Sequence, residues 1–395
     1  MRRTEVLQGL RRMKFETILE RWRGRELSQW EAAEILGMSE RTFRRWRDRF
    51  EDEGLEGLYD RRLGTASAKR VPADQIGRVL ELYRTRYSGF TTKHFHEHLV
   101  RDHGFGLGYT WTKTTLQRAG LVARARRRGA HRKKRPRRPL RGMMLHQDGS
   151  SHEWIEGLGR SLDLIVTLDD ATSEIYSAFL VEEEGTMSTF QGLCEVIGAQ
   201  GLPCTLYSDR GSHYFHTPKA GDKVDKGRLT QVGRALGQLG IEHIAAYSPQ
   251  ARGRSERAFG TLQDRLPKEL RLAGITTIEA ANRFIVELYL PAHNARFATA
   301  PEQPGSAFVP DAARAHLDIL CVHEERTVGN DNTVRYKRLI LQIPPSPIRH
   351  HYVKARVRVH EYPDRHLAVF HGPRCLARYR AGGEMIDADD GRRAA

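Results

Sequence analysis

Three carboxylates have the residue types and settings that metal-dependent phosphate chemistry requires. Asp148 follows the short apolar run 143–146, and Asp209 follows the run 204–207. Glu256 stands in the first turn of a predicted helix. Mg²⁺ takes few protein carboxylates and leaves its other octahedral positions to water and phosphate oxygens. If two strands and a helix bring these acids together, they could hold two Mg²⁺ ions about 4 Å apart against a DNA phosphate, with Mn²⁺ as a substitute.

Each acid also has an ordinary structural explanation. An Asp after a strand commonly forms a turn, and a Glu in a first helical turn stabilises the helix dipole. The order of Asp148, Asp209 and Glu256 along the chain, in strand, strand and helix, favours the catalytic and metal-binding interpretation. Asp169 and Asp170 are rival carboxylates, but they lie at a predicted hairpin tip and are expected to form the turn.

Basic and polar residues around Glu256 are expected to contact the DNA strand that is cut. The candidates are Gln250, Arg252, Arg254 and Arg257, and Arg210 is expected to neutralise a phosphate. In the helix predicted over 254–272, an apolar stripe faces the protein, and a basic face that includes Arg265 and Lys268 is expected to face DNA. A solvated surface is the alternative explanation for these cations.

The elements that would position the acids lie in residues 142–312, which we interpret as an α/β catalytic core. Three strands linked by short turns come first, and helices and strands then alternate, which is the order of an RNase H-like fold. The strands are expected over 143–146, 162–168, 175–181, 204–207 and 242–246. The helices are expected over 188–200, 229–239, 254–272 and 278–289.

Residues 1–65 have the pattern of an all-α helix-turn-helix DNA-binding domain. The segment Ser28–Glu31 matches a capping box, and Ser39 can cap a second helix over 40–50. That helix buries its aromatic residues and is expected to place arginines in the major groove. These arginines are Arg41, Arg44, Arg45 and Arg47. An α-hairpin with a solvated basic face is the alternative.

A second helical DNA-binding domain is expected over residues 66–123. Its histidines are expected to be exposed on helices, and a metal site is the less favoured alternative, because no cysteines accompany them. They are His94, His96, His98 and His103. Residues 124–141 form a basic linker that would follow a DNA backbone, and its candidate contacts are Arg127, Arg128, Lys133 and Lys134.

Strand-like runs return after the core and predict a small β-barrel over residues 313–382. The polar segment 383–395 is expected to be a disordered tail. The whole chain is therefore expected to be multidomain, with helix-turn-helix units first, the RNase H-like core in the centre and the barrel last.

The charge of the chain is concentrated in its first third. Residues 1–140 contain 34 Lys and Arg against 17 Asp and Glu, and the remaining residues contain 31 against 32. This asymmetry indicates a polyanionic partner, and DNA or RNA fits better than an anionic membrane, which would favour an amphipathic anchor helix. The four cysteines form no CxxC pair, so a reducing cytoplasm is the expected compartment.

Four segments together resemble the DDE-type insertion-sequence transposases, whose core is similar to that of retroviral integrases. They are HQDGS at 146–150, YSDRGSH at 207–213, YSPQARGRSER at 247–257 and PAHNARF at 291–297. Two features depart from the family. The 46 residues between the second and third acids exceed the usual interval, with an extra polar stretch at 216–227, and the N-terminus lacks a His/His/Cys/Cys zinc module.

The resemblance implies an RNase H-like core, dependence on a divalent metal, and binding of the terminal inverted repeats of a mobile element. It also implies a homo-oligomer acting on paired DNA ends and then on target DNA. By motif, it assigns the metal-ligand roles to Asp148, Asp209 and Glu256. Two alternatives remain open, namely a helix-turn-helix regulator with an inactive core and a nuclease that cuts without joining.

Overall fold

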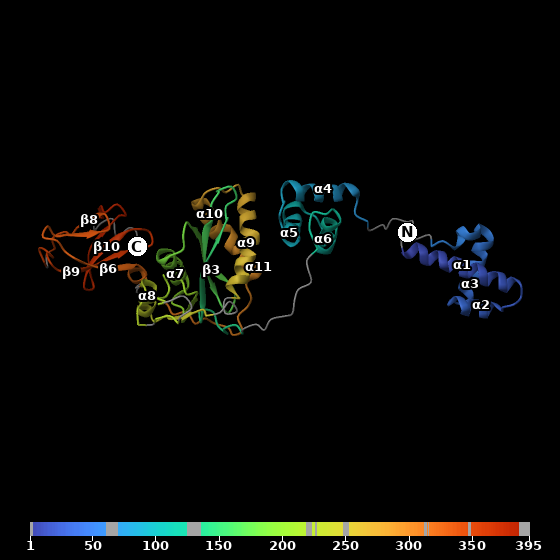
Figure 1. Ribbon diagram of the computed structural model, residues 1–395, viewed down its shortest axis with the longest axis horizontal. Helices are drawn as coiled ribbons and strands as arrows, with labels where there is room; N and C mark the ends of the chain where they lie inside the picture. Colours follow the sequence, from blue (N-terminus) through green and yellow to red (C-terminus); the bar gives the residue numbers. More distant parts are fainter. Residues whose placement is uncertain are drawn as a thin grey trace. The chain divides into compact units, whose positions relative to one another are not determined.

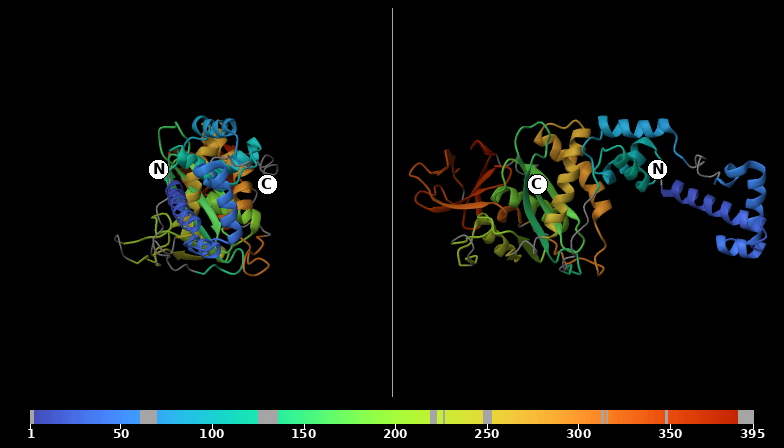
Figure 2. Two further views of the ribbon diagram at one scale, coloured as in Figure 1. Left: turned by 90° about the vertical axis from the view of Figure 1, so that its right-hand side faces the viewer. Right: turned by 45° about the vertical axis from the view of Figure 1, so that its right-hand side comes forward.

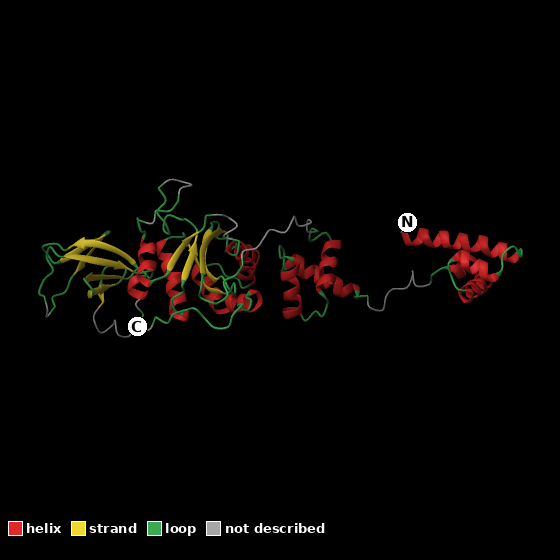
Figure 3. Ribbon diagram, turned by 90° about the horizontal axis from the view of Figure 1, so that it is seen from below, coloured by secondary structure: helices red, strands yellow, loops and turns green. Residues whose placement is uncertain are grey.

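The protein is described by a computed structural model whose helices and strands fall in distinct parts of the chain (Figures 1 and 3). The described residues are 3–60, 70–124, 136–218, 223–225, 227–247, 253–311, 314, 316–346 and 349–386. The chain divides into two compact units, Met1–Arg78 and Val79–Ala395. None of the helices in the described ranges has the length and apolar character needed to cross a membrane.

The first unit is helical and contains the expected helix-turn-helix. Its elements are α1 (Arg3–Arg23), α2 (Gln29–Leu36), α3 (Glu40–Glu53) and the 3₁₀ turn Gly54–Leu58. The predicted capping box at Ser28 is confirmed, because the Ser28 hydroxyl accepts from the Glu31 amide and the Glu31 carboxylate accepts from the Ser28 amide. Gly37 ends α2 in the left-handed conformation, with φ 66°, and allows the tight turn to Ser39, which caps α3.

Three more helices precede the sheet. They are α4 (Ala73–Thr85), within which the two units divide, α5 (Thr92–His103) and α6 (Tyr109–Arg118). In the second unit an aromatic core that includes Tyr87, Phe90 and Phe95 holds them together, and Leu272 of the core helix α9 packs against it. This helical group is therefore attached to α9.

The central sheet has the strand order β3-β2-β1-β4-β5. Its strands are β1 (Leu145–His152), β2 (Leu162–Asp169), β3 (Ile175–Val181), β4 (Thr205–Ser208) and β5 (Glu242–Ala245). The first three are antiparallel neighbours, and β4 and β5 run parallel to β1. This is the RNase H-like arrangement expected from the sequence.

Helices cover both faces of this sheet, so the core has three layers (Figure 1). One face carries α7 (Thr186–Gln200) and α8 (Gln231–Leu239). The other carries α9 (Ser255–Leu272), α10 (Ile278–Phe284), the π-helical turn Ile285–Tyr289 and α11 (Leu290–Phe297). Two apolar clusters fill the spaces between the layers, and they fix each helix against the strands.

The C-terminal part is rich in β-structure. After α12 (His316–Ile319) come β6 (Val322–Thr327), β7 (Thr333–Tyr336), β8 (Leu339–Gln342), β9 (Arg356–Glu361), β10 (Leu367–His371), β11 (Arg374–Tyr379) and β12 (Met385–Ile386). The strands form a five-stranded sheet, β12-β11-β10-β9-β6, and a β7-β8 ribbon that shares its apolar core. No pairing among the described strands closes this sheet, so the predicted barrel is not confirmed. The strand β12 lies in the segment expected to be a tail, and residues 387–395 lie outside the described ranges.

Candidate metal and DNA site

Asp148 lies on β1, and Asp209 directly follows β4, which is the parallel neighbour of β1. In the pairing of β1 with β4, Leu145 is opposite Leu206 and His146 is opposite Tyr207. The ladder ends at this pair, and Asp148 and Asp209 each lie two residues beyond it. The sequence had suggested that Asp148 follows the first strand. It lies within β1, because β1 continues to His152. The Oδ1 atom of Asp209 accepts a hydrogen bond from the Gly211 amide at 2.8 Å, which orients this carboxylate.

The side chain of Asp148 belongs to the face of the sheet that α9 covers. Gln147 faces the other layer, because its Nε2 donates to the Thr189 carbonyl of α7. Ser150 faces α9, and its hydroxyl accepts from Gln263 Nε2 at 3.0 Å. Because side chains alternate along a strand, Asp148 shares the face of Ser150.

Two contacts of α9 place Glu256 along β1. At one end Arg254 pairs with Asp170, whose carboxylate also bonds His146 of β1. At the other end Gln263 contacts Ser150, so α9 runs in the same direction as β1, and Figure 2 shows the golden helix alongside the green strands. On α9, Glu256 lies between the contact residues Arg254 and Gln263. On β1, Asp148 lies between the contact residues His146 and Ser150. The seven residues from Glu256 to Gln263 make almost two whole turns, so both residues share one helix face.

The Asp170 carboxylate fixes the start of α9 and is fully buried. It accepts hydrogen bonds from the Arg138 amide at 2.7 Å and from His146 Nε2 at 2.8 Å, and Arg254 Nε lies 2.6 Å away. Burial alone would raise the pKa of Asp170, but these two hydrogen bonds and the charge of Arg254 lower it to about 2. Asp170 and Asp169 do lie at the hairpin turn, as expected, but both are buried hydrogen-bonding centres rather than exposed turn residues.

A further carboxylate, Glu184, lies beside this region and was not singled out in the sequence. A Cβ atom added to Gly149 would stand 2.2 Å from Glu184 Oε2, so this carboxylate lies directly against the residue after Asp148. Burial raises the pKa of the Tyr214 hydroxyl well above its ordinary value, and the negative charges of Glu184, Asp148 and Asp209 raise it further. The acidic run 182–184 after β3 was the available signal.

The donor chemistry of Asp148, Asp209 and Glu256 fits Mg²⁺, since all the ligand atoms are carboxylate oxygens. Asp148 is 7% exposed, whereas Glu256 is exposed. Among the described residues, the groups of three metal-ligating side chains whose donor atoms all lie within 4.8 Å are His94 with His98 and Glu269, and Cys321 with His323 and His360. The acidic trio is in neither group. A two-ion site does not require such closeness, because ligands of different ions can stand about 8 Å apart when the ions are about 4 Å apart.

The expected DNA-contacting residues have different surroundings. On α3, Arg41, Arg44 and Arg45 are exposed, whereas Arg47 is half-buried, with its guanidinium 5.4 Å from the Trp22 ring centroid. Arg257 is exposed, next to Glu256. Arg254 is mostly buried in its ion pair with Asp170, so its guanidinium serves the protein itself. The candidates Arg127, Arg128, Lys133, Lys134, Gln250 and Arg252 lie outside the described residues.

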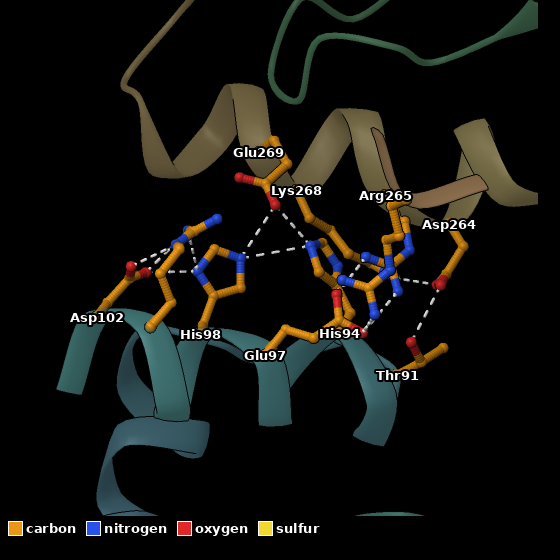
Figure 4. Close-up of polar contacts among 11 residues, drawn as sticks. Thr91, His94, Glu97, His98, Asp102, Asp264, Arg265, Lys268 and Glu269 are labelled. Carbon is orange, nitrogen blue, oxygen red and sulfur yellow. Dashed lines mark hydrogen bonds and ion pairs between the residues drawn. The ribbon is translucent and has the colours of Figure 1, made fainter. Parts of the chain in front are cut away.

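The basic face of α9 packs against α5 instead of lying open (Figure 4). Arg265 pairs with Glu97 of α5 through two hydrogen bonds of 2.8 and 3.2 Å, and Lys268 pairs with Asp264 within α9. The expectation that Arg265 and Lys268 face DNA is therefore wrong for these two residues. Their partners are residues of the protein, and Glu97 is far from α9 in sequence.

The expectation of exposed helix histidines is wrong for His94 and His98, which are 1% and 2% exposed. Both imidazoles face Glu269 of α9. Burial lowers the pKa of His94. Burial alone would raise the pKa of Glu269, but hydrogen bonds from His94 and His98 lower it to about 2. These shifts favour a neutral His94 ring and an ionised Glu269 carboxylate.

Comparisons with known proteins place this geometry in context. A family model described as "Winged helix-turn helix" matches residues 17–76, which include α2 and α3. A relative from Sinorhizobium fredii, named "Putative transposase y4bF", is 32% identical over 343 residues, covering 86% of this chain and 74% of that protein. The "Transposase for insertion sequence IS1202" of Streptococcus pneumoniae is 30% identical over 203 residues, covering 51% of this chain and 43% of that protein.

Two solved structures are also similar. A chain of a simian T-cell lymphotropic virus intasome is 14% identical with a TM-score of 0.32, and the match covers 78% of this chain and 99% of that chain. The HTLV-2 integrase catalytic core domain in complex with magnesium is 16% identical with a TM-score of 0.28, and the match covers 38% of this chain and 88% of that chain.

Proposed function

The chain belongs to the insertion-sequence transposases, and on that premise we propose that it cuts and joins DNA at a site formed by Asp148, Asp209 and Glu256. The observation that supports the proposal is the parallel pairing of β1 with β4, because Asp148 and Asp209 each lie two residues beyond its last pair, His146 with Tyr207. The two contacts that fix α9 along β1 support the third position, because they hold Glu256 beside the same stretch of strand.

The three carboxylates would hold two Mg²⁺ ions, for which Mn²⁺ can substitute. When bound, such ions lower the pKa of the attacking hydroxyl group and neutralise charge on the phosphate. Asp148 is positioned by the sheet, and Asp209, directly after β4, is held by the Gly211 amide. Glu256 is positioned by α9, whose first turn is fixed through Arg254 and Asp170. The protein would thereby supply its oxygen ligands from fixed positions.

The proposed reaction has two steps at each end of the element. In hydrolysis, water forms a P–O bond as the P–O3′ bond breaks, which leaves a 5′-phosphate on the flanking DNA and a free 3′-hydroxyl on the element. That hydroxyl then attacks a phosphodiester of target DNA, so that one P–O bond forms as another breaks. Arg257, exposed beside Glu256, would contact the phosphates of the reacting strand, together with Gln250 and Arg252.

DNA binding follows from the helix-turn-helix and the family, and we assign recognition of the element's terminal inverted repeats to α3. Arg41, Arg44 and Arg45 project into solvent from the first half of this helix. In a helix-turn-helix these are the positions that reach base edges in the major groove. The basic linker residues would follow the DNA backbone between the helical units and the core. Bringing two ends together implies a homo-oligomer on DNA.

The test is a cleavage and strand-transfer assay with oligonucleotides of the DNA ends that flank the parent gene. In Mg²⁺, Asp209→Asn and Glu256→Gln should abolish both steps while end binding, measured by fluorescence anisotropy, stays near that of the wild type. Glu279→Gln is the matched control, because Glu279 is also an exposed glutamate in the first turn of a core helix. Glu279→Gln removes the same favourable interaction with a helix dipole, but it removes no proposed metal ligand.

The same assay separates the alternatives. A wild-type protein that hydrolyses ends but never joins pre-cleaved ends to a target is a nuclease. A protein that binds ends and does neither is a regulator with an inactive core. Joining activity retained by Asp209→Asn would contradict the assignment of the acids.

A further inference from the structure

A buried group of donor atoms joins α5 to α9 at a distance from the acidic trio. The Nε2 atoms of His94 and His98 lie 2.6 and 3.0 Å from Glu269 Oε1, and they lie 3.3 Å from each other. Figure 4 shows the two imidazoles of α5 and the carboxylate of α9 pointing to one place between the helices. Glu269 is thirteen residues after Glu256, which is about 20 Å along the helix.

The spacing in sequence accounts for the convergence. His94 and His98 are four residues apart on α5, so their side chains project from the same helix face. Two histidines at this spacing on one helix are a recurrent pair of zinc ligands, and a glutamate from another helix commonly completes such a set. Here Glu269 lies 175 residues after His94, so folding alone supplies the third donor.

The hydrogen-bond partners of His98 leave room for a cation. Its Nδ1 lies 2.7 Å from Asp102 Oδ2, and a carboxylate only accepts, so the proton of a neutral ring belongs on Nδ1. The Nε2 lone pair then faces Glu269 Oε1, which is also an acceptor. Arg101 Nη2, 2.9 Å from the same Nδ1, favours the opposite tautomer, in which the group holds only hydrogen bonds. The experiment below separates these two states.

The distances are close to those of a tetrahedral ion. With metal–ligand bonds of about 2.0–2.1 Å, two ligand atoms of a tetrahedron stand about 3.3 Å apart. The two nitrogens already have this separation, at 3.3 Å. The carboxylate oxygen stands 2.6 and 3.0 Å from them, so it would have to withdraw by only about 0.3–0.7 Å to admit an ion.

We propose that His94, His98 and Glu269 bind one Zn²⁺ ion, or a similar divalent transition metal, that fastens α5 to the catalytic helix α9. Two imidazoles and one carboxylate suit Zn²⁺, whereas Mg²⁺ prefers oxygen ligands alone. The three residues line a cavity of about 650 Å³, which gives the ion a route from solvent and leaves its fourth position to water. Asp102 holds the outer nitrogen of His98, as carboxylates do around zinc-bound histidines.

The second group of candidate ligands has a less suitable geometry. The rings of His323 and His360 are stacked, with centroids 3.8 Å apart and planes at 13°. The lone pairs of an imidazole lie in the plane of its ring, so stacked rings direct them side by side rather than toward one ion. Cys321 therefore lacks two converging nitrogen partners, and the proposal is confined to the group on α5 and α9.

An ion at this site would set the position of the helical group relative to the core. It would connect residues more than 170 positions apart in sequence and stabilise the folded chain by mass action. The site also lies beside the Arg265–Glu97 ion pair, which joins the same two helices. The inference does not depend on the proposed DNA chemistry, since it concerns different residues and a different class of ion.

The test is a titration of the full-length, chelator-treated chain with Co²⁺, a spectroscopic substitute for Zn²⁺. The wild type should bind one ion with the visible absorption of four-coordinate Co²⁺, and Zn²⁺ should displace it. His94→Gln and Glu269→Gln should lose this absorption, and Asp102→Asn should weaken binding by about 10- to 100-fold. His96→Gln, on the same helix, should show the same four-coordinate absorption as the wild type.

Thermal unfolding supplies a second readout. Zn²⁺ should raise the unfolding temperature of the wild type and of His96→Gln, but not that of Glu269→Gln, with circular dichroism confirming that each variant is folded. Absence of Co²⁺ uptake by the wild type would overturn the proposal even if every variant failed to fold. Four-coordinate Co²⁺ absorption that His94→Gln and Glu269→Gln retain would also overturn it, and a sulfur-to-cobalt band would then locate the ion at Cys321.

Discussion

Replacing Asp170 by Asn should release the start of the catalytic helix. The buried carboxylate accepts hydrogen bonds from the Arg138 amide and from His146 Nε2, and it neutralises Arg254. Asn keeps the shape of the side chain but carries no charge, and its amide nitrogen cannot accept from these donors. Arg254, whose side chain is only 12% exposed, would then be left without its counter-charge.

The loss of folding free energy in Asp170→Asn follows from the pKa shift of Asp170 and, separately, from the typical energy of a buried ion pair. The pKa of Asp170 falls from 3.8 to about 2, which corresponds to about 2.5 kcal/mol in favour of the charged form. Breaking a buried ion pair by removing one partner typically costs about 3–5 kcal/mol. We therefore expect Asp170→Asn to lower the free energy of unfolding of the core by about 3 kcal/mol at neutral pH.

The pH dependence has a definite sign. The folded pKa of Asp170 lies below the unfolded value, so its contribution is complete above about pH 4 and is lost as the pH falls toward 2. The variant lacks this contribution at every pH. The difference between wild type and variant should therefore be largest at neutral pH and shrink progressively below pH 4.

The assay is urea unfolding of the full chain followed by pulsed hydrogen exchange of peptides that span β1 and β2, so that the transition of the core is read separately from those of the other domains. Asp169→Asn is the matched control. Asp169 is also fully buried and accepts from the Gly142 and Thr172 amides, but the ion pair with Arg254 belongs to Asp170.

The two variants should differ in catalysis as well as stability. Only Asp170→Asn loosens the segment before Glu256, and a misplacement of about 1 Å in a catalytic group can cost about 100-fold in rate. DNA cleavage should therefore fall further in Asp170→Asn than in Asp169→Asn when both are assayed well below their unfolding transitions. This role of the ion pair would be refuted if Asp170→Asn and Asp169→Asn lost the same free energy of unfolding with the same pH dependence. It would also be refuted if the two variants cleaved DNA at equal rates.

Further predictions concern recognition and packing around the site. Arg44→Ala should weaken binding to the element ends by about 1–3 kcal/mol in anisotropy titrations, while Arg49→Ala, near the end of the same helix, should change it little. Equal effects of the two would mean that α3 does not read bases. Gly149→Ala should slow cleavage, because its Cβ would stand 2.2 Å from Glu184 Oε2 and displace that carboxylate. Gly260→Ala on α9, where nothing lies within 4 Å, should leave the cleavage rate unchanged, and a wild-type rate for both alanine variants would exclude a role for Glu184 near the site.

The core could be predicted from sequence because its signals are local. Apolar, β-branched runs bounded by turns predicted β2 and β3 to within a residue, and helical periodicity predicted α9. The end of β1 was harder to find. The Asp-Gly-Ser sequence after Gln147 is typical of a turn, but pairing with β2 carries the strand through it to His152.

The elements that were missed depend on tertiary partners. The strand β6 has the sequence VHEERT, whose charged residues hide any apolar alternation, and its pairing with β9 is what makes it a strand. His94 and His98 give a weak local signal for burial, because the residue that they face, Glu269, is on another helix far along the chain. Arg254 was expected at DNA for the same reason, since Asp170 is distant in sequence.

The most direct test of the central claim is an anomalous difference map from crystals of the protein soaked in Mn²⁺. A peak bound by carboxylate oxygens of both Asp148 and Asp209 is expected, with metal–oxygen distances of about 2.1 Å. In crystals with a DNA end bound, a second peak about 4 Å away should contact Glu256. Mn²⁺ that binds elsewhere, with no peak between Asp148 and Asp209 in the DNA complex, would contradict the claim.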